Sequence, residues 1–128
     1  MAGIPHTTRA YTAGMRPISL QRFEQLVGEA LDEIPDDLWD RFANVAVVVE
    51  DENPQEPGLL GLYTGIPLTE RWDYSGVLPD RIAIYRIPLC LMCSNDDELV
   101  EEIRVTVIHE LAHHVGIDED QLHELGWG

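Results

Sequence analysis

The residues with the clearest chemical potential lie near the C-terminal end of the chain, where His109, Glu110 and His113 form the pattern His-Glu-x-x-His. Residues four apart on an α-helix lie one above the other, so two imidazoles at this spacing can bind one Zn²⁺ at ~2.1 Å. Glu110 is too close in sequence to complete a tetrahedron well. It can instead take a proton from a metal-bound water, whose pKa zinc lowers to about 7. The spacing therefore predicts a zinc site with a general base beside it.

The segment around this motif carries the signals of a helix. Ser94 and Asp97 have the spacing of a capping box, acidic residues follow in the first turn, and Gly116 is a typical helix stop. At ~100° per residue, one stripe is apolar and the opposite stripe contains both histidines. The apolar stripe contains Val105, Ile108, Ala112 and Val115, and the opposite stripe contains Glu102, Thr106, His109 and His113. We therefore expect the two histidines to face away from the core.

A catalytic zinc site uses three protein ligands and keeps a fourth position open, whereas a structural site closes with four. We expect the third ligand from the short segment after His113, because Gly116 can adopt the left-handed conformation that turns the chain back toward the metal. The candidates in this segment are Asp118, Glu119, Asp120, His123 and Glu124.

Glu119 is the first choice among these candidates. It occupies the last position of the longer zinc pattern His-Glu-x-x-His-x-x-Gly-x-x-His. Asp118 and Gln121 have the N-cap and N3 spacing of a short helix over residues 119–125, which would occupy the Asp118 carboxylate. Asp120 and His123 remain alternatives.

The stretch from His109 to Trp127 resembles the small single-domain zincin-like metallopeptidases. Their pattern is His-Glu-x-x-His-x-x-Gly, an acid at the third-ligand position and a short Glu-Leu-Gly ending. The resemblance implies that His109 and His113 bind zinc, that Glu110 is the general base and that Glu119 is the third ligand. The family acid is usually Asp, so this chain has a longer side chain there. No Met follows Met92, so the methionine turn of the metzincins is absent.

The resemblance also implies a minimal zincin fold, in which a strand near the active-site helix pairs with an extended peptide substrate. Residues 58–63 and residues 81–87 are the two candidate strands. The sequence does not distinguish between them.

The rest of the chain predicts an α+β domain, with a small sheet packed against the active-site helix and two or three further helices. Residues 18–34 have helical periodicity, and Pro35 starts a second, short helix. Strands are expected at 45–49, 58–63 and 81–87, with an irregular segment over 64–80 and helical structure after 87. We expect residues 1–17 to be a flexible lead-in and residues 18–128 to form one domain.

Composition narrows the range of functions. The chain has 128 residues, 24 of them acidic and 8 basic, and a formal net charge of -16. This charge disfavours nucleic-acid binding and favours basic peptide or protein partners. No apolar run approaches the ~20 residues of a membrane span, and we expect a cytoplasmic location. Cys90 and Cys93 are expected to be ordinary buried thiols rather than a redox pair.

Two hypotheses follow from these observations. The first is a zinc-dependent peptidase that hydrolyses peptide bonds through a metal-activated water. The alternative is a non-catalytic, metal-binding regulatory or interaction module on the same scaffold, which the presence of Glu110 disfavours because a structural site has no use for a general base. A metal-dependent ribonuclease ranks last, because the related three-histidine pattern lacks the Glu and the charge is unsuited to RNA.

Overall fold

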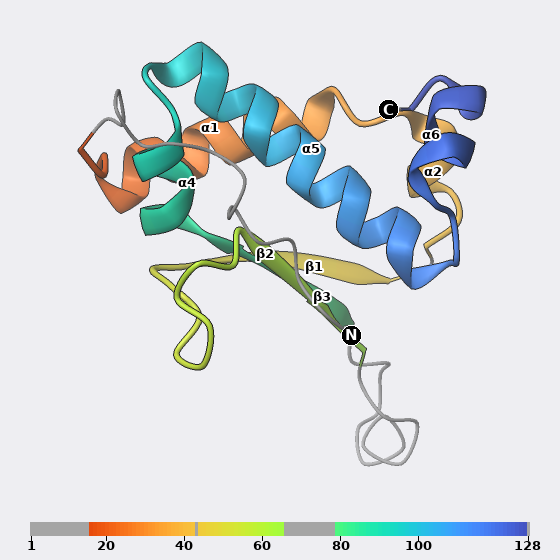
Figure 1. Cartoon of the computed structure of the whole chain (residues 1–128), viewed down its shortest axis with the longest axis horizontal. Coiled ribbons are helices and arrows are strands. Elements are labelled where there is room, and N and C mark those ends of the chain that lie inside the picture. Colours follow the sequence, from red (N-terminus) through yellow and green to blue (C-terminus); the bar gives the residue numbers. More distant parts are fainter. Residues whose placement is uncertain (1–15, 43, 66–78, 128) are drawn as a thin grey trace.

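The computed structural model describes residues 16–42, 44–65 and 79–127, and these residues form an α+β fold with helices on one side of a small sheet (Figure 1). The fold class agrees with the prediction from the sequence. The elements, in chain order, are α1 (Leu20–Asp32), α2 (Asp36–Trp39), β1 (Val45–Glu50), β2 (Gly61–Thr64), β3 (Asp80–Tyr85), α4 (Arg86–Met92), α5 (Asp96–His114) and α6 (Glu119–Leu125).

The sheet has three strands in the order β1-β3-β2. β3 lies in the middle, parallel to β1 and antiparallel to β2. Its side chains alternate between the two faces of the sheet, so Ile82 and Ile84 belong to the main core and Ala83 and Tyr85 to a smaller cluster. Within the described residues, β1 and β2 each have one strand neighbour.

Helices α1 and α5 lie side by side over one face of this sheet (Figure 1). Their facing side chains form the main core together with those of β3. Each fully buried aliphatic or aromatic side chain contributes about 1.5–3 kcal/mol, so α5 is held along most of its length. The central members from the two helices are Phe23, Leu26, Ala30, Leu99, Ile103, Val107 and Leu111.

The start of α5 differs by one residue from the prediction. Asn95, not Ser94, is the N-cap, and its side chain accepts a hydrogen bond from the Glu98 backbone N–H at 2.8 Å. The Ser94 backbone N–H donates to Oε2 of Glu98 at 2.8 Å, so Ser94 takes part through its backbone. Asn and Ser cap helices about equally well, and the sequence places them next to each other.

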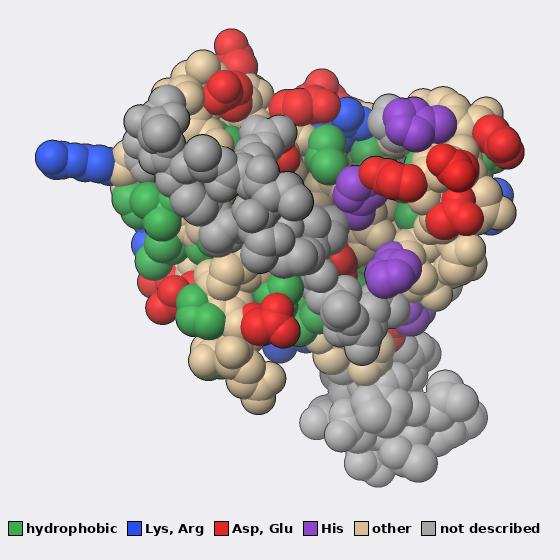
Figure 2. All heavy atoms as spheres, in the orientation of Figure 1, with side chains coloured by type: hydrophobic (Ala, Val, Ile, Leu, Met, Phe, Trp, Pro, Cys, Tyr) green, Lys and Arg blue, Asp and Glu red, His purple; other side chains and the backbone are tan. Residues whose placement is uncertain are grey.

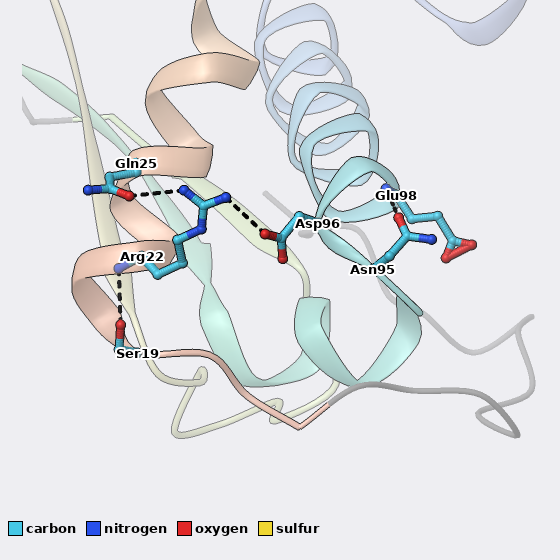
Figure 3. Close-up of polar contacts among 6 residues, drawn as sticks. All are labelled: Ser19, Arg22, Gln25, Asn95, Asp96 and Glu98. Carbon is cyan, nitrogen blue, oxygen red and sulfur yellow. Dashed lines mark hydrogen bonds and ion pairs between the residues drawn. The ribbon is translucent and has the colours of Figure 1, made fainter.

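The first turns of α1 and α5 are joined by a polar contact (Figure 3). Ser19 caps α1, as expected, by accepting from the Arg22 backbone N–H at 3.1 Å. The Arg22 guanidinium donates to Gln25 at 3.0 Å and to Asp96 at 2.9 Å. Both charged side chains are exposed, so this ion pair contributes only ~0–1 kcal/mol. The relative position of the two helices is set by the apolar core that they share.

Other element bounds agree with the predictions to within a few residues. The second strand begins at Gly61 rather than at 58. The third strand ends at Tyr85 rather than at 87, because Arg86 opens α4. Pro88 is tolerated in the first turn of that helix, where a backbone N–H has no intrahelical partner. Residues 1–15 of the predicted lead-in over 1–17, and residues 66–78 of the predicted irregular segment over 64–80, lie outside the described residues.

Two further expectations can be compared with the structure. Cys90 and Cys93 are both buried and are not joined in a disulfide, and burial raises the pKa of the Cys90 thiol. None of the helices in the described ranges is long and apolar enough to cross a membrane.

Gly61 allows β2 to lie against α5. A Cβ atom at this position would stand 2.6 Å from Cγ2 of Thr106 and 3.1 Å from the carbonyl oxygen of Ala83. Such distances are far inside ordinary van der Waals contact, so any side chain at residue 61 would push β2 away from the helix.

We expect Gly61→Ala to lower the free energy of unfolding by about 1–3 kcal/mol, because the added methyl overpacks the contact between β2 and α5. Urea unfolding of the metal-free protein measures this. Gly28→Ala in α1 is the matched control: a Cβ there meets no atom within 4 Å, so it should stabilise by ~0.4–1 kcal/mol. Thr106→Ser in the Gly61→Ala background should recover part of the loss. Equal stability of the two glycine variants would contradict the close packing.

Candidate functional site

The helix α5 presents different sides to the sheet and to α6. Glu110 and Thr106 are buried, and β2 packs on the side of α5 that carries Thr106. His109 is partly exposed, with 29% of its side-chain surface accessible, and His113 is exposed. The two histidines therefore lie outside the core, as the stripe pattern predicts.

The stripe pattern predicts the exposure of two residues wrongly. Thr106, assigned to the polar stripe, is 1% exposed, and Val115, assigned to the apolar stripe, is 41% exposed. For Thr106 the reason is the close approach of β2, which packs on this side of α5. Val115 is the C-cap of α5, beyond its last helical residue. Residue types along one helix do not reveal which neighbour will pack on it.

Glu110 is a fully buried carboxyl group with one oxygen engaged. Its Oε1 accepts a hydrogen bond from the backbone N–H of Tyr63 at 2.8 Å. Its Oε2 is buried and has no hydrogen-bond partner among the described residues. Burial raises the pKa of Glu110 from its ordinary value of 4.5 to about 7, and the Tyr63 N–H works in the opposite direction. Near neutral pH this group can therefore both accept and release a proton.

The Tyr63 N–H that holds Glu110 belongs to the outer side of β2. The N–H of Tyr85 donates to the carbonyl oxygen of Leu60 at 3.0 Å, and Tyr63 pairs with Ile82 in the same register. Peptide groups alternate along an antiparallel strand, so the N–H of Tyr63 points away from β3. Glu110 is thus tied to the outer side of the strand that packs on α5.

The chain after α5 turns back and brings Glu119 against His109. Gly116 has the left-handed conformation expected of it, with φ 80°. Asp118 and Gln121 form the expected capping box of α6, with both hydrogen bonds at 2.9 Å. The Asp118 side chain is therefore occupied. The next residue, Glu119, places Oε1 2.8 Å from Nε2 of His109.

His109, His113 and Glu119 line one pocket of about 320 Å³ between the end of α5 and α6. Histidine and acidic side chains gather over these two elements on the face shown in Figure 2. The alternative ligand His123 lines the neighbouring pocket, where it shares the walls with His109 and Glu119.

The donor types in this pocket fit zinc, which binds imidazole nitrogens and carboxylate oxygens. Nε2 of His109 and Oε1 of Glu119 lie 2.8 Å apart, which is a direct polar contact. Two tetrahedral ligands at ~2.0–2.1 Å from a zinc ion stand roughly 3.3 Å apart, so the two side chains would move apart slightly to hold the ion. In the described part of the chain, no three His, Cys, Asp or Glu side chains are already arranged around one metal position. Side-chain rotation of His113 would have to complete the set, and the ligand roles stay a prediction.

Two contacts that position the site had no signal in the sequence. The first is the Tyr63 N–H on Glu110. The second is the stacking of the Tyr63 and His114 rings, whose centroids lie 4.0 Å apart at 18°. The Tyr63 hydroxyl also donates to Asp80 at 2.7 Å. The first two contacts fasten the end of α5 to β2, and the third joins β2 to β3.

The raised pKa of Glu110 predicts how the free energy of unfolding depends on pH. Between pH 4.5 and about 7 the folded protein retains a proton that the unfolded chain has lost, so the free energy of unfolding falls as pH rises through this window. The total effect of this group is about 3 kcal/mol. We therefore compare the free energy of unfolding of Glu110→Gln and of wild type, both without metal. Their difference should shift by that amount in favour of the variant as pH rises from 4.5 to 8. Urea unfolding at both pH values measures it; a constant difference would contradict the burial of an ionisable Glu110.

Comparisons with known proteins bear on the family. The family model described as "Zincin-like metallopeptidase" matches residues 42–127, which include β1 to α6. The solved structure of a conserved hypothetical protein from Thermus thermophilus is similar, with a TM-score of 0.51 and 27% identity. The match covers 76% of this chain and 94% of that one. No curated protein matches the sequence. Because the family model covers well over half of the chain, the protein belongs to the zincin-like metallopeptidase family.

Proposed function

We propose that this protein is a zinc-dependent peptidase that hydrolyses peptide bonds. In this proposal His109, His113 and Glu119 hold the zinc, and Glu110 is the general base. The observation that supports it most strongly is the setting of Glu110, directly beside His109 in the motif. One oxygen of its buried carboxyl group is fixed by a backbone N–H, and the other has no partner among the described residues.

When bound, zinc would polarise the substrate carbonyl and lower the pKa of a water molecule. Glu110 would accept a proton from the attacking water at Oε2 and later pass it to the leaving amine. The Tyr63 N–H keeps Oε1 in place, so the carboxyl group does not rotate away between the two proton transfers. A pKa near the working pH suits a group that must do both.

The strand order supports one of the two candidate substrate strands over the other. β3 lies between β1 and β2, so its backbone groups are already paired. β2 lies against α5 and, within the described ranges, pairs with a strand on one side only. We infer that an extended peptide adds to the outer side of β2. The charge of -16 favours substrates with basic residues.

One observation favours the alternative of a metal-binding module without turnover. Glu110 is fully buried, and a base must reach solvent or substrate to work. A local movement that brings Oε2 to the water while Oε1 stays on the Tyr63 N–H would be needed in each catalytic cycle. If no such movement occurs, the same residues form a site that holds metal for stability or for interaction.

Activity on an unfolded protein distinguishes the two. Protein stripped with a chelator and reloaded with zinc should cleave reduced, unfolded casein and basic peptides, and the stripped protein should be at least ~100-fold slower. Mass spectrometry of the fragments gives the cleavage sites. A zinc-loaded protein that cleaves none of these substrates would overturn the proposed hydrolase and favour the binding module.

A further inference from the structure

The strand β2, which carries the Tyr63 N–H that holds Glu110, is short and lies at an edge of the described sheet. It has four residues and, among the described strands, pairs with β3 alone. The backbone groups of Leu62 and Thr64 point toward β3, since they alternate with those of Tyr63. Thr64 is exposed and ends the strand. The backbone ladder therefore holds Tyr63 only through its two neighbours, one of which is the exposed end of the strand.

The side chain of Tyr63 provides a second attachment. Its ring is 3% exposed and stacks on the ring of His114, the last residue of α5, with the centroids 4.0 Å apart. The Phe42 ring lies beside it, at a centroid distance of 6.1 Å. The hydroxyl group donates a hydrogen bond to Oδ2 of Asp80 at 2.7 Å. Hydrogen bonds to a carboxylate are roughly twice as strong as those between neutral groups, so this contact holds the far end of the ring firmly.

Asp80 is a fixed point to which the ring can be attached. It is the first residue of β3, the middle strand, and it pairs with Val45 of β1 in the parallel register. Its backbone N–H donates to the carbonyl oxygen of Asn44 at 3.1 Å. The anchor of the Tyr63 ring therefore belongs to the strand that is paired on both sides.

These contacts form a continuous path to the carboxyl group of Glu110. The Asp80 carboxylate holds the Tyr63 hydroxyl group at 2.7 Å, and the Tyr63 backbone N–H holds Oε1 of Glu110 at 2.8 Å. The ring between them is rigid and buried. If the hydroxyl contact is lost, the ring and the end of β2 can shift, and the N–H shifts with them. A displacement of ~1 Å in a catalytic site can cost ~100-fold in rate.

We propose that Asp80 and the hydroxyl group of Tyr63 are positioning groups for Glu110: they determine where the backbone N–H holds its carboxyl group. The inference rests on the proposed function in one respect, namely that Glu110 is the base whose position matters for the reaction. The positioning of the carboxyl group itself needs neither zinc nor substrate, so it can be measured without them.

Amide hydrogen exchange of the metal-free protein tests the positioning. Tyr63→Phe removes the hydroxyl group and keeps the ring. We expect the amide at residue 63 to exchange at least ~10-fold faster than in wild type, relative to the amide of Ile82 in the core of β3. Asp80→Ala should give the same result. Asp80→Asn, whose side-chain oxygen can still accept the hydrogen bond, should retain most of the protection.

Tyr85→Phe is the matched control. The Tyr85 hydroxyl group also takes part in a buried hydrogen bond, which it accepts from Nδ2 of Asn53 at 2.9 Å. Tyr85 belongs to the smaller cluster, not to the main core that α5 shares. The variant therefore removes a buried tyrosine hydroxyl group without touching the path to Glu110. The amide at residue 63, again relative to that of Ile82, should exchange as in wild type.

Kinetics of the zinc-loaded variants test the effect on the reaction. Tyr63→Phe should lower kcat for unfolded casein about 10-fold, with KM within about twofold of wild type and zinc content unchanged. Tyr85→Phe should keep the wild-type kcat. In the Glu110→Gln background, Tyr63→Phe should cause no further loss, because the side chain that it positions is no longer a base.

The results distinguish this inference from the function on which it rests. Wild-type exchange at residue 63 in Tyr63→Phe would overturn the inference and leave the peptidase proposal intact. An equal loss of kcat in Tyr63→Phe and Tyr85→Phe would also overturn it, since the loss of a buried hydrogen bond alone would then explain both. If the zinc-loaded wild type cleaves nothing, the proposed function fails. Faster exchange at residue 63 in Tyr63→Phe would still support the positioning of Glu110, and unchanged exchange would overturn it.

Discussion

Glu110→Gln should lower kcat for peptide cleavage by about 10²–10⁴-fold while zinc stays bound at the wild-type ratio. Glutamine has nearly the same shape, and its carbonyl oxygen can still accept the hydrogen bond from the Tyr63 N–H. It cannot take a proton from water. The variant therefore removes the chemistry and keeps the packing of a fully buried side chain.

The measurement pairs kcat on unfolded casein with metal analysis of the same sample. Glu124→Gln is the matched control: it changes an exposed acid on α6 that lines neither pocket, so activity should be unchanged. Removal of the proton acceptor should lower kcat by at least about 100-fold. If Glu110→Gln instead keeps more than about a tenth of the wild-type activity, Glu110 is not the general base.

His109→Ala and His113→Ala should each weaken zinc binding by more than ~100-fold. Loss of a residue that merely supports a metal ligand already costs about 10–100-fold, and each of these variants would remove a ligand itself. Competition with a chromophoric chelator measures the affinity. Glu124→Ala is the control, because Glu124 is exposed on α6 and lines neither pocket. It should bind zinc as tightly as wild type does.

The same measurement tests the third ligand. Glu119→Ala should also lose zinc, and Glu119→Asp, which restores the acid usual in the family, should retain it. His123→Ala should bind zinc normally. If His123→Ala loses zinc and His113→Ala does not, the metal lies in the neighbouring pocket and the ligand set is wrong.

Features set by neighbours in the sequence were predictable. The capping box of Asp118 and Gln121 and the left-handed Gly116 involve residues within a few positions of one another. Local hydrogen bonds and backbone preferences decide such features, so the sequence states them directly. The same logic argues against Asp118 as a ligand. Glu119, the first choice among the remaining candidates, lies against His109 in the structure.

Features that depend on distant segments were not predictable. The hydrogen bond between Tyr63 and Glu110 joins residues 47 positions apart, and it depends on which side of β2 faces α5. A shift of β2 by one residue would turn that N–H toward β3 instead. The burial of Thr106 has the same origin, since only the bare backbone of Gly61 lets the strand approach.

The capping of α5 is an intermediate case. The sequence indicates that the helix begins near residue 95, but Ser94 and Asn95 are both good caps. The choice depends on the route by which the chain leaves α4, and this route is set by packing. An error of one residue in such a start leaves the positions of His109 and His113 on the helix unchanged.

The central claim is that His109, His113 and Glu119 hold one zinc ion beside Glu110. A crystal soaked in zinc, with diffraction recorded on both sides of the zinc absorption edge, tests it most directly. We predict one strong anomalous peak about 2.0–2.2 Å from both imidazoles and the Glu119 carboxylate, with Glu110 outside the ligand set. No peak in excess zinc, or a peak away from both histidines, would contradict the account.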